Sequence, residues 1–347
     1  MDKYMVFCTL FDSGYLDKGL ALYRSMRKRI GDFRLYIAAF DHKCHEVLSA
    51  MNLKNVVLIP LEEILDDRLR QKKKERTRGE FCWTCTSVVI EHVLIRYRET
   101  VCTYIDADIY FFANPAGIIR QIAEHGCSVG VAPHGFERSY WDVEQKINNG
   151  RYCIHFNTFF HTKDGMKVLR EWKEDCYHWC YSRCEDGKLG DQKYADRWKM
   201  KYSCVYEIRN LGAGAAPWNV HLYTFHGRKD GKIMLGYRKE KFPLIFYHFE
   251  GLKYLDDGSV FLNLWKYTVP GLKKKVIEIY GEYFREIGAV RKYLAKNYGV
   301  TFDAMRGDKK TFMKQRCSLK EFCRNRGLLG GLQDWTGFRV NNLMREK

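Results

Sequence analysis

Strand-like and helix-like segments alternate near the start of the chain, and this pattern restricts the fold most. Apolar runs typical of strands occupy residues 4–9, 33–40 and 56–59. Residues 16–29 and 44–51 lie between them and have apolar side chains at helical spacing. Strands that alternate with helices indicate a parallel sheet with helices on its faces. We therefore expect an α/β fold.

The segment TYIDADIYFFANP, residues 103–115, places two aspartates where a further apolar strand ends. Side chains two apart in an extended chain point the same way, so Asp106 and Asp108 are expected to be neighbours. Burying two carboxylates together costs free energy unless a cation lies between them. The pair indicates either a divalent cation or a polar strand end. Ligands of open α/β sheets bind at the carboxyl ends of strands, which favours a role in chemistry.

The segments that surround this pair continue the α/β pattern. We expect a helix over residues 81–97, strands over 101–105 and 128–132, and a helix over 165–181. The charged run at 68–78, which includes QKKKERTR, is expected to be a solvated loop rather than a phosphate clamp.

The C-terminal part has a different character. Residues 277–298 predict an amphipathic helix with Tyr280, Phe284, Ile287 and Leu294 on one stripe. The segment from residue 305 onward is basic and interleaved with aromatic residues. Two interpretations stay open for it: a surface that meets anionic membrane headgroups, or a helical subdomain that packs on the core.

Composition sets the class of protein. The chain has 347 residues, of which 46% are hydrophobic and 29% charged. This is typical of a soluble globular protein with one large domain and an appendage, or with two domains. No secretory signal or transmembrane helix is expected. The net charge of +17 favours a polyanionic partner, such as nucleic acid, an anionic membrane surface or a phosphorylated substrate.

The 13 cysteines show no disulfide-like spacing, so we expect reduced thiols in a cytosol. Cys82 and Cys85 could be half of a zinc site, but no second pair follows at zinc spacing. Cys176, Cys180 and Cys184 repeat every four residues, which predicts buried thiols on one helix face rather than a metal site.

Six segments follow one another along the chain: CTLFDSGYLDKGLALYRSM, CWTCT, YIDADIYFFANP, EDGKLGDQKYADRW, GAGAAPWN and YHFEGLK. In this order they resemble segments of the nucleotide-sugar glycosyltransferases of the GT-A fold. The chain is similar to the group that contains glycogenin and the bacterial lipopolysaccharide glucosyl- and galactosyltransferases, and to a bacterial branch found with surface-polysaccharide genes. The resemblance covers about residues 4–255 and leaves out the basic C-terminal part.

The resemblance implies a metal site. Asp106 and Asp108 would bind Mn²⁺ or Mg²⁺, Asp106 would also contact the ribose, and His248 would complete the metal shell. A hard cation suits this reaction because a diphosphate leaves with negative charge. The family's diphosphate-binding lysine corresponds to Lys253, although this chain is one residue shorter between glycine and lysine than glycogenin-like sequences. The residue pattern alone would equally allow His248 to be a core histidine.

The resemblance also implies a uridine site in the first strand-to-helix loop, formed by Thr9, Asp12 and Tyr15. A tyrosine ring can stack on uracil, and an aspartate can accept from N3 or from ribose hydroxyls. The letters FDSGY alone are equally compatible with a turn and a helix cap.

Three further residues correspond to the family's contacts with the donor sugar. Asn157 would face the sugar, and Asp191 and Gln192 would contact hydroxyls beside the anomeric carbon. Amides and carboxylates suit this because they take paired hydrogen bonds from neighbouring hydroxyls. The pattern alone allows Asp191 to be a helix N-cap.

Three classes of function compete. A glycosyltransferase accounts for the aspartate pair, His248 and the sheet together. A nucleotidyltransferase usually needs a glycine-rich basic loop after the first strand, where this chain has the acidic FDSGYLDKG. A nucleic-acid-binding protein would leave the acidic strand end unexplained, and the chain has no recognisable DNA- or RNA-binding signature.

We therefore predict a GT-A domain over residues 1–260 and a basic helical extension over 261–347. The domain would move a hexose from a UDP-sugar to a glycan or lipid-linked glycan, with retention of configuration. The expected setting is bacterial cell-surface polysaccharide or lipopolysaccharide assembly, in the cytoplasm and at the inner face of the membrane. Nucleic acid is not an expected partner.

Overall fold

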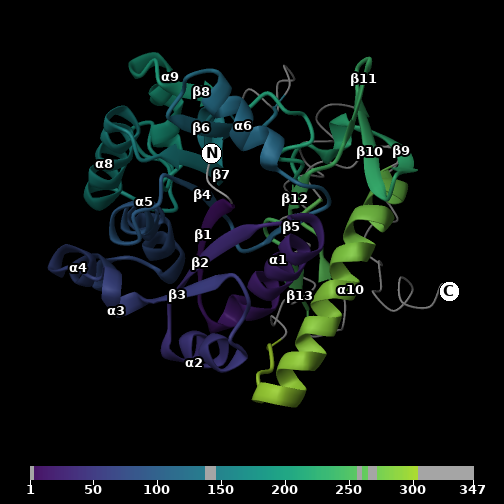
Figure 1. Cartoon of the computed structure of the whole chain (residues 1–347), viewed down its shortest axis with the longest axis horizontal. Helices are drawn as coiled ribbons and strands as arrows, with labels where there is room; N and C mark the ends of the chain where they lie inside the picture. The colour runs from purple at the N-terminus through teal and green to yellow at the C-terminus, as the bar shows by residue number, and fades with distance from the viewer. Residues whose placement is uncertain (1–3, 137–145, 256–259, 265–271, 304–347) are drawn as a thin grey trace, which may run out of the picture. The chain divides into compact units, whose positions relative to one another are not determined.

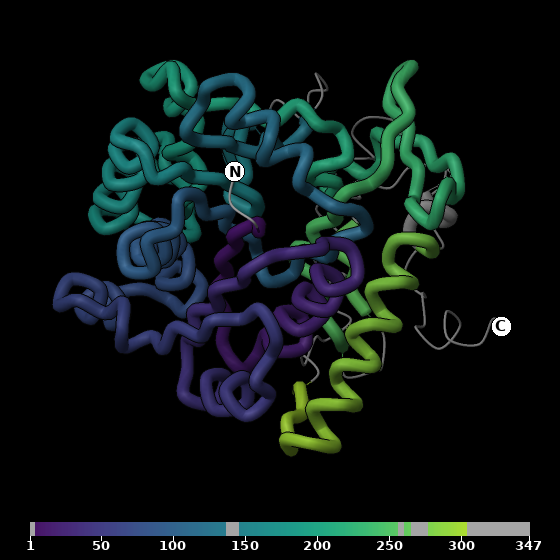
Figure 2. The backbone as a smooth tube through the Cα atoms, in the orientation of Figure 1, coloured from purple at the N-terminus to yellow at the C-terminus, as the bar shows by residue number. Residues whose placement is uncertain are grey.

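The computed structural model describes residues 4–136, 146–255, 260–264 and 272–303 (Figure 1). The chain divides into two compact units, Met1–His248 and Phe249–Lys347. Figure 2 traces the backbone of each unit, coloured by residue number. The domain boundary expected after residue 260 stays a prediction.

The first unit is built on the mixed, mostly parallel sheet that the sequence predicts. Within the described residues its strand order is β3-β2-β1-β4-β7-β6-β8. Strand β1 pairs in parallel with β2 and β4, β2 pairs in parallel with β3, and β6 pairs in parallel with β8. Strand β7 runs antiparallel to both β4 and β6. The strands are β1 (Met5–Phe11), β2 (Phe33–Ala39), β3 (Val56–Pro60), β4 (Val101–Ile105), β6 (Val129–Pro133), β7 (Tyr152–Phe160) and β8 (Val205–Glu207).

Helices flank this sheet, which confirms the predicted α/β class (Figure 1). The α-helices of the first unit are α1 (Leu16–Arg29), α2 (His42–Met51), α3 (Leu61–Ile64), α4 (Asp67–Glu75), α5 (Arg78–Arg96), α6 (Ala116–Glu124), α8 (Lys163–His178) and α9 (Trp198–Lys201). Short 3-10 helices occupy Ser13–Tyr15, Lys193–Arg197 and Val220–Leu222.

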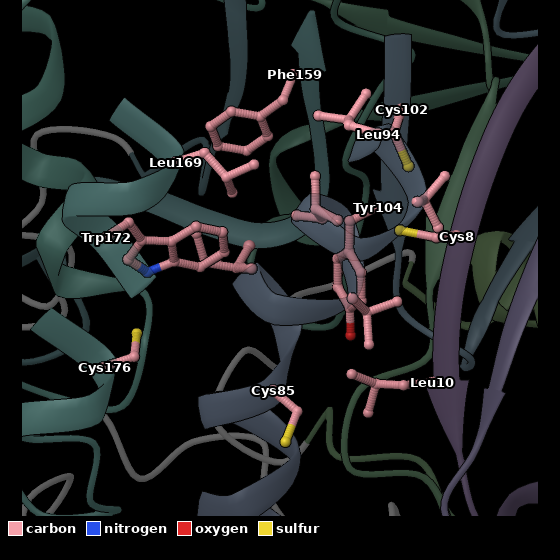
Figure 3. Packing of buried hydrophobic residues seen from close by; sticks show 14 of the residues in the cluster. Cys8, Leu10, Cys85, Leu94, Cys102, Tyr104, Phe159, Leu169, Trp172 and Cys176 are labelled. Atoms are coloured by element: carbon pink, nitrogen blue, oxygen red, sulfur yellow. The ribbon is translucent and has the colours of Figure 1, made fainter. Parts of the chain in front are cut away.

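Side chains of β1 alternate between two apolar layers, as a strand buried on both faces requires. Cys8 and Leu10 belong to one buried cluster, together with residues of α5 and α8 such as Cys85 and Trp172 (Figure 3). Phe7 points to the other layer, where its ring lies 6.3 Å from that of Phe111.

Two smaller sheets complete the first unit. Strand β5 (Ile109–Phe111) follows β4 and pairs antiparallel with β12 (Phe246–His248), and His248 pairs with Ile109. Helix α1 supports β5, since the Ser25 hydroxyl accepts a 3.0 Å hydrogen bond from the Phe111 backbone N–H. Strands β9 (Thr224–Lys229), β10 (Lys232–Tyr237) and β11 (Glu240–Pro243) form an antiparallel sheet.

The second unit contains β13 (Lys253–Tyr254), β14 (Val260–Phe261) and the long helix α10 (Leu272–Tyr298). The predicted apolar stripe is confirmed, because Tyr280, Phe284, Ile287 and Leu294 are all buried. The basic segment from residue 305 lies outside the described residues, as does the membrane surface expected there. In the part of the chain that is described, no helix has the length and apolarity needed to cross a membrane.

The prediction of a loop at residues 68–78 is wrong, because helix α4 occupies most of this segment. Asp66 caps this helix by accepting a hydrogen bond from the Leu69 N–H at 2.7 Å. Lysine, arginine, glutamine and glutamate are all good helix formers, so a charged run between caps favours a helix. After α4, the Arg76 guanidinium is buried and donates to the carbonyl oxygens of Cys176 and Tyr177 at the end of α8.

The prediction that Cys176, Cys180 and Cys184 share one face of a helix is also wrong. Helix α8 ends at His178, and Trp179 is extended. Cys176 and Cys180 are buried as expected, whereas Cys184 is exposed. The eleven cysteines among the described residues are all free thiols.

Helix α5 begins with a capping box in which Thr77 and Glu80 satisfy each other's backbone N–H groups. The Glu80 carboxylate accepts hydrogen bonds from the Thr77 N–H at 2.9 Å and from the Ser182 N–H at 2.7 Å. Burial alone would raise the pKa of Glu80, but these bonds to its charged form lower that pKa from 4.5 to about 2. The carboxylate thus joins the start of α5 to the segment after α8.

We predict that Glu80→Gln destabilises the protein by about 1.5–3 kcal/mol at neutral pH, because backbone N–H groups lose a charged acceptor. A lowered pKa in the folded state stabilises above the ordinary pKa, so the difference between the proteins should shrink as pH falls from about 4.5 toward 2. Urea unfolding at pH about 7 and about 3 measures this. Glu62→Gln, at an exposed position of α3, is the matched control. A loss of equal size at both pH values would contradict the prediction.

Candidate active site

Two carboxylates follow the carboxyl end of strand β4, in the middle of the main sheet. The strand ends at Ile105, and Asp106 and Asp108 lie in the turn that leads into β5. The Asp106 N–H donates to the His155 carbonyl oxygen and the Ile109 N–H to the Asp106 carbonyl oxygen, both at 3.1 Å. The Tyr104 hydroxyl donates to the Asp106 carboxylate at 2.9 Å. The turn is therefore held on both sides of the pair.

Strand β12 brings His248 to the same turn, although it comes much later in the sequence. Its Nε2 lies 3.1 Å from Asp108 Oδ1 and 3.6 Å from Asp106 Oδ2. One ligand atom from each of the three residues lies within 4.8 Å of the others. The structure thus brings together the three residues that were expected to share a metal ion.

The charges of this group depend on one another. Burial would raise the pKa of Asp108, but the nearby His248 imidazolium lowers it below its ordinary value. Burial would lower the pKa of His248, but the Asp108 carboxylate raises it well above its ordinary value. The protonated ring therefore supplies the positive charge that two adjacent carboxylates need.

The donor set fits the cation that the resemblance implies. Carboxylate oxygens are the ligands that Mg²⁺ and Mn²⁺ prefer, and an imidazole nitrogen is compatible with Mn²⁺. Three protein ligands leave coordination positions open for phosphate oxygens and water. The side chains of Asp106 and Asp108 keep 31% and 12% of their surface exposed, so the site opens toward solvent on the Asp106 side.

Asp191 is close enough to Asp106 for the charge of Asp106 to act on its carboxyl group. Its side chain is buried, and the Trp172 indole N–H donates to its carbonyl oxygen at 2.9 Å. Burial first, and then the Asp106 charge, raise the pKa of Asp191 to about 8. A carboxyl group that is neutral at neutral pH can donate as well as accept a hydrogen bond.

The two amides expected at the donor sugar have different surroundings. Asn157 is buried on β7 beside Tyr104 of β4, and its Oδ1 has no hydrogen-bond partner among the described residues. Gln192 is half-buried and donates from Nε2 to the Asn149 carbonyl oxygen at 2.7 Å. Asn157 therefore has an acceptor left for a ligand, and Gln192 uses one of its two Nε2–H groups within the protein.

The expected uridine residues lie on and after β1. Thr9 is fully buried, and its Oγ1 has no hydrogen-bond partner within the described part of the chain. Asp12 accepts from the Gly14 N–H at 2.9 Å and forms an ion pair with Arg78. Tyr15 has 42% of its surface exposed, with the Lys18 ammonium 3.7 Å from its ring centre. The Tyr15 ring is thus partly exposed and has a lysine ammonium over one face.

Arg78, the first residue of α5, is a charged neighbour of this loop that the sequence reasoning missed. Besides its ion pair with Asp12, its Nη2 lies 3.5 Å from Asp41 Oδ2, and Asp41 also accepts from the Ser13 N–H. In the sequence, the only sign that Arg78 makes these contacts was its position between a charged run and a buried helix. Lys253 lies on β13 in the second unit, so its role at the diphosphate stays a prediction.

A group of buried imidazoles borders the carboxylates and was also missed. The ring centre of His155 lies 5.2 Å from that of His248, and the Cys153 thiol is close to both. Burial and the charge of His248 lower the pKa of His155 well below its ordinary value, and burial lowers that of His134 to about 4. Cys153 and His155 are two apart on one strand, the same signal that identified the aspartate pair.

Comparison with known proteins identifies two relatives by sequence and a shared fold by structure. No protein-family model matches the chain. It is 32% identical over 260 residues to YfnF of Bacillus subtilis strain 168, covering 73% of this chain and 84% of the relative. It is 28% identical over 269 residues to YfnD of the same strain, covering 76% and 82%. Both relatives are uncharacterised.

Among solved structures, the galactosyltransferase LgtC, crystallised with donor and acceptor sugar analogues, superposes with a TM-score of 0.50. The match covers 82% of this chain and 96% of LgtC at 12% sequence identity. At this identity the likeness shows the fold, and the predicted GT-A fold is confirmed.

We predict that Mn²⁺ stabilises the wild-type protein and that Asp108→Asn abolishes this effect, because the variant keeps the side-chain volume but loses a charged ligand. A bound cation should add about 2.7 kcal/mol when its free concentration is about 100 times its Kd. Thermal unfolding with Mn²⁺ and with chelator measures the difference. Asp32→Asn, at an exposed position, is the control. An Asp108→Asn variant that Mn²⁺ stabilises as much as wild type would refute the assignment.

Proposed function

This chain belongs to the family of the Bacillus subtilis protein YfnF, and we propose that it is a metal-dependent glycosyltransferase that uses a UDP-sugar donor. The observation that supports this most is the group of Asp106, Asp108 and His248 in a GT-A fold. The group lies at the carboxyl end of β4, where open α/β sheets bind their ligands.

In this proposal Asp106 and Asp108 bind Mn²⁺ or Mg²⁺ with His248. The cation supplies Lewis-acid stabilisation of the diphosphate that leaves the sugar. With two carboxylates and the imidazole, deprotonated on binding, as ligands, the formal charges of cation and protein ligands would cancel, and open coordination positions would remain for phosphate oxygens. Lys253 is the proposed source of further positive charge at the diphosphate.

Thr9, Asp12 and Tyr15 are proposed to hold the uridine. The buried Thr9 hydroxyl on β1 would supply a polar contact, and the exposed Tyr15 ring after it would supply a stacking contact. Asp12 can accept from uracil or ribose only where its contact with Arg78 leaves a lone pair available. Binding of uridine is therefore expected to involve Arg78.

Asn157, Asp191 and Gln192 are proposed to orient the donor sugar. Asn157 has an acceptor oxygen without a partner, and Asp191 is buried and affected by the charge of Asp106. A hydroxyl beside the anomeric carbon could pair with both. The hydrogen bond to Asn149 uses one Nε2–H of Gln192, so a second N–H and Oε1 remain for a sugar hydroxyl.

The acceptor is proposed to be a glycan or a lipid-linked glycan of a bacterial cell-surface polysaccharide or lipopolysaccharide. This rests on the resemblance to transferases of that kind. The basic C-terminal part is proposed to attract an anionic membrane surface from the cytoplasmic side, since each basic residue near such a surface contributes about 1 kcal/mol.

We predict that UDP binds with Mn²⁺ and binds weakly with chelator, because the cation neutralises the diphosphate. Isothermal titration calorimetry measures both conditions, and a panel of UDP-sugars identifies the donor by cation-dependent hydrolysis. Asp108→Asn should lose UDP binding and hydrolysis, while Asp32→Asn should keep both. UDP binding that is equal with and without Mn²⁺ would argue against the metal role.

We predict that the product keeps the anomeric configuration of the donor. The glycogenin-like group retains configuration, and the described residues of the site include no further carboxylate marked as an inverting base. Proton NMR of the anomeric coupling in the product decides this directly. An inverted linkage would refute retention and leave the donor assignment intact.

A further inference from the structure

We propose that Cys153, His155 and His248 form a second cation site, with a preference for Zn²⁺, next to the Asp106–Asp108 pair. The proposal does not depend on the transfer activity. It rests on the positions of three buried side chains and on nitrogen atoms that have no hydrogen-bond partner.

The backbone places the three ligands close together. Cys153 and His155 are two apart on β7, and the paired β6 strand shifts register between Val131 and Ala132, beside Cys153. One ligand atom from each of Cys153, His155 and His248 lies within 4.8 Å of the others. Small side-chain rotations would bring such a set to the distances of a tetrahedral zinc site.

His155 has unsatisfied nitrogen atoms. The residue is fully buried, and neither ring nitrogen has a hydrogen-bond partner among the described residues. A buried polar group without a partner destabilises the folded state. Gly214 lies against this ring, and a Cβ there would be 3.2 Å from His155 Nε2. A cation that accepts a lone pair from His155 would remove part of this cost.

His248 has a nitrogen for each site. Its Nε2 faces Asp108 at 3.1 Å, while its Nδ1 has no partner within the described chain. The two sites would therefore share one ring, and the cation can enter from the partly exposed Asp106 side.

The donor atoms distinguish the two sites chemically. One sulfur and two imidazole nitrogens are a ligand set that zinc prefers, whereas carboxylate oxygens suit Mg²⁺ and Mn²⁺. On binding, the Cys153 thiol and the protonated His248 ring each release one proton to solvent, and the sulfur and the freed ring nitrogen bond to the cation, with no change of oxidation state. A fourth position is left for water.

X-ray absorption spectroscopy at the zinc edge, on the wild-type protein with one equivalent of Zn²⁺, tests the site directly. We expect one sulfur at about 2.3 Å and nitrogens at about 2.0–2.1 Å from the zinc. A shell of oxygen and nitrogen without sulfur would place the zinc at the aspartates and overturn the proposal.

Variants identify the sulfur. Cys153→Ser should weaken zinc binding roughly tenfold or more, and Cys184→Ser, which removes an exposed thiol, should leave it unchanged. Co²⁺ gives a second measurement, because thiolate-to-cobalt absorption should appear in wild type and in Asp108→Asn and be absent from Cys153→Ser. Equal zinc affinity in wild type and a folded Cys153→Ser variant, or thiolate absorption lost only in Cys184→Ser, would overturn the proposal.

Discussion

The charge interaction between His248 and the two aspartates of the β4–β5 turn is the constraint on which the rest of the first unit depends. Two carboxylates can be partly buried side by side only with a positive charge next to them. Strand β12 supplies that charge, and its pairing with β5 fixes where His248 lies. The backbone hydrogen bond from Asp106 to His155 then connects the same turn to β7.

The parts of the fold that were predicted from the sequence are those with local signals. Apolar runs and helical spacing near the start of the chain identified β1 to β3 and the two helices between them, because each element has its own period. The spacing of Asp106 and Asp108 predicted that the two carboxylates lie together, and they do, but in the turn after β4 rather than by alternation along a strand. The residues proposed for the donor came from the resemblance, and their roles stay predictions.

The parts that were missed had either a local signal that was given too little weight or contacts between distant segments. The charged run before α5 was expected to be a loop because its charge was weighed above its helix propensity and the cap at Asp66. The meeting of Arg78 with Asp12 and Asp41 combines three separate segments. No local pattern predicts that Cys153, His155 and His248 converge, because β7 and β12 do not pair with each other among the described strands.

The wide separation of Asp108 and His248 along the chain has a consequence for folding kinetics. Strand β12 can pair with β5 only after the intervening strands and helices have begun to assemble, because closing a long loop costs entropy before any contact forms. A cation held by all three ligands would therefore stabilise the native state more than the transition state for folding. Such a cation slows unfolding and leaves the folding rate nearly unchanged. The lifetime of the folded chain would then follow the concentration of the free cation around it.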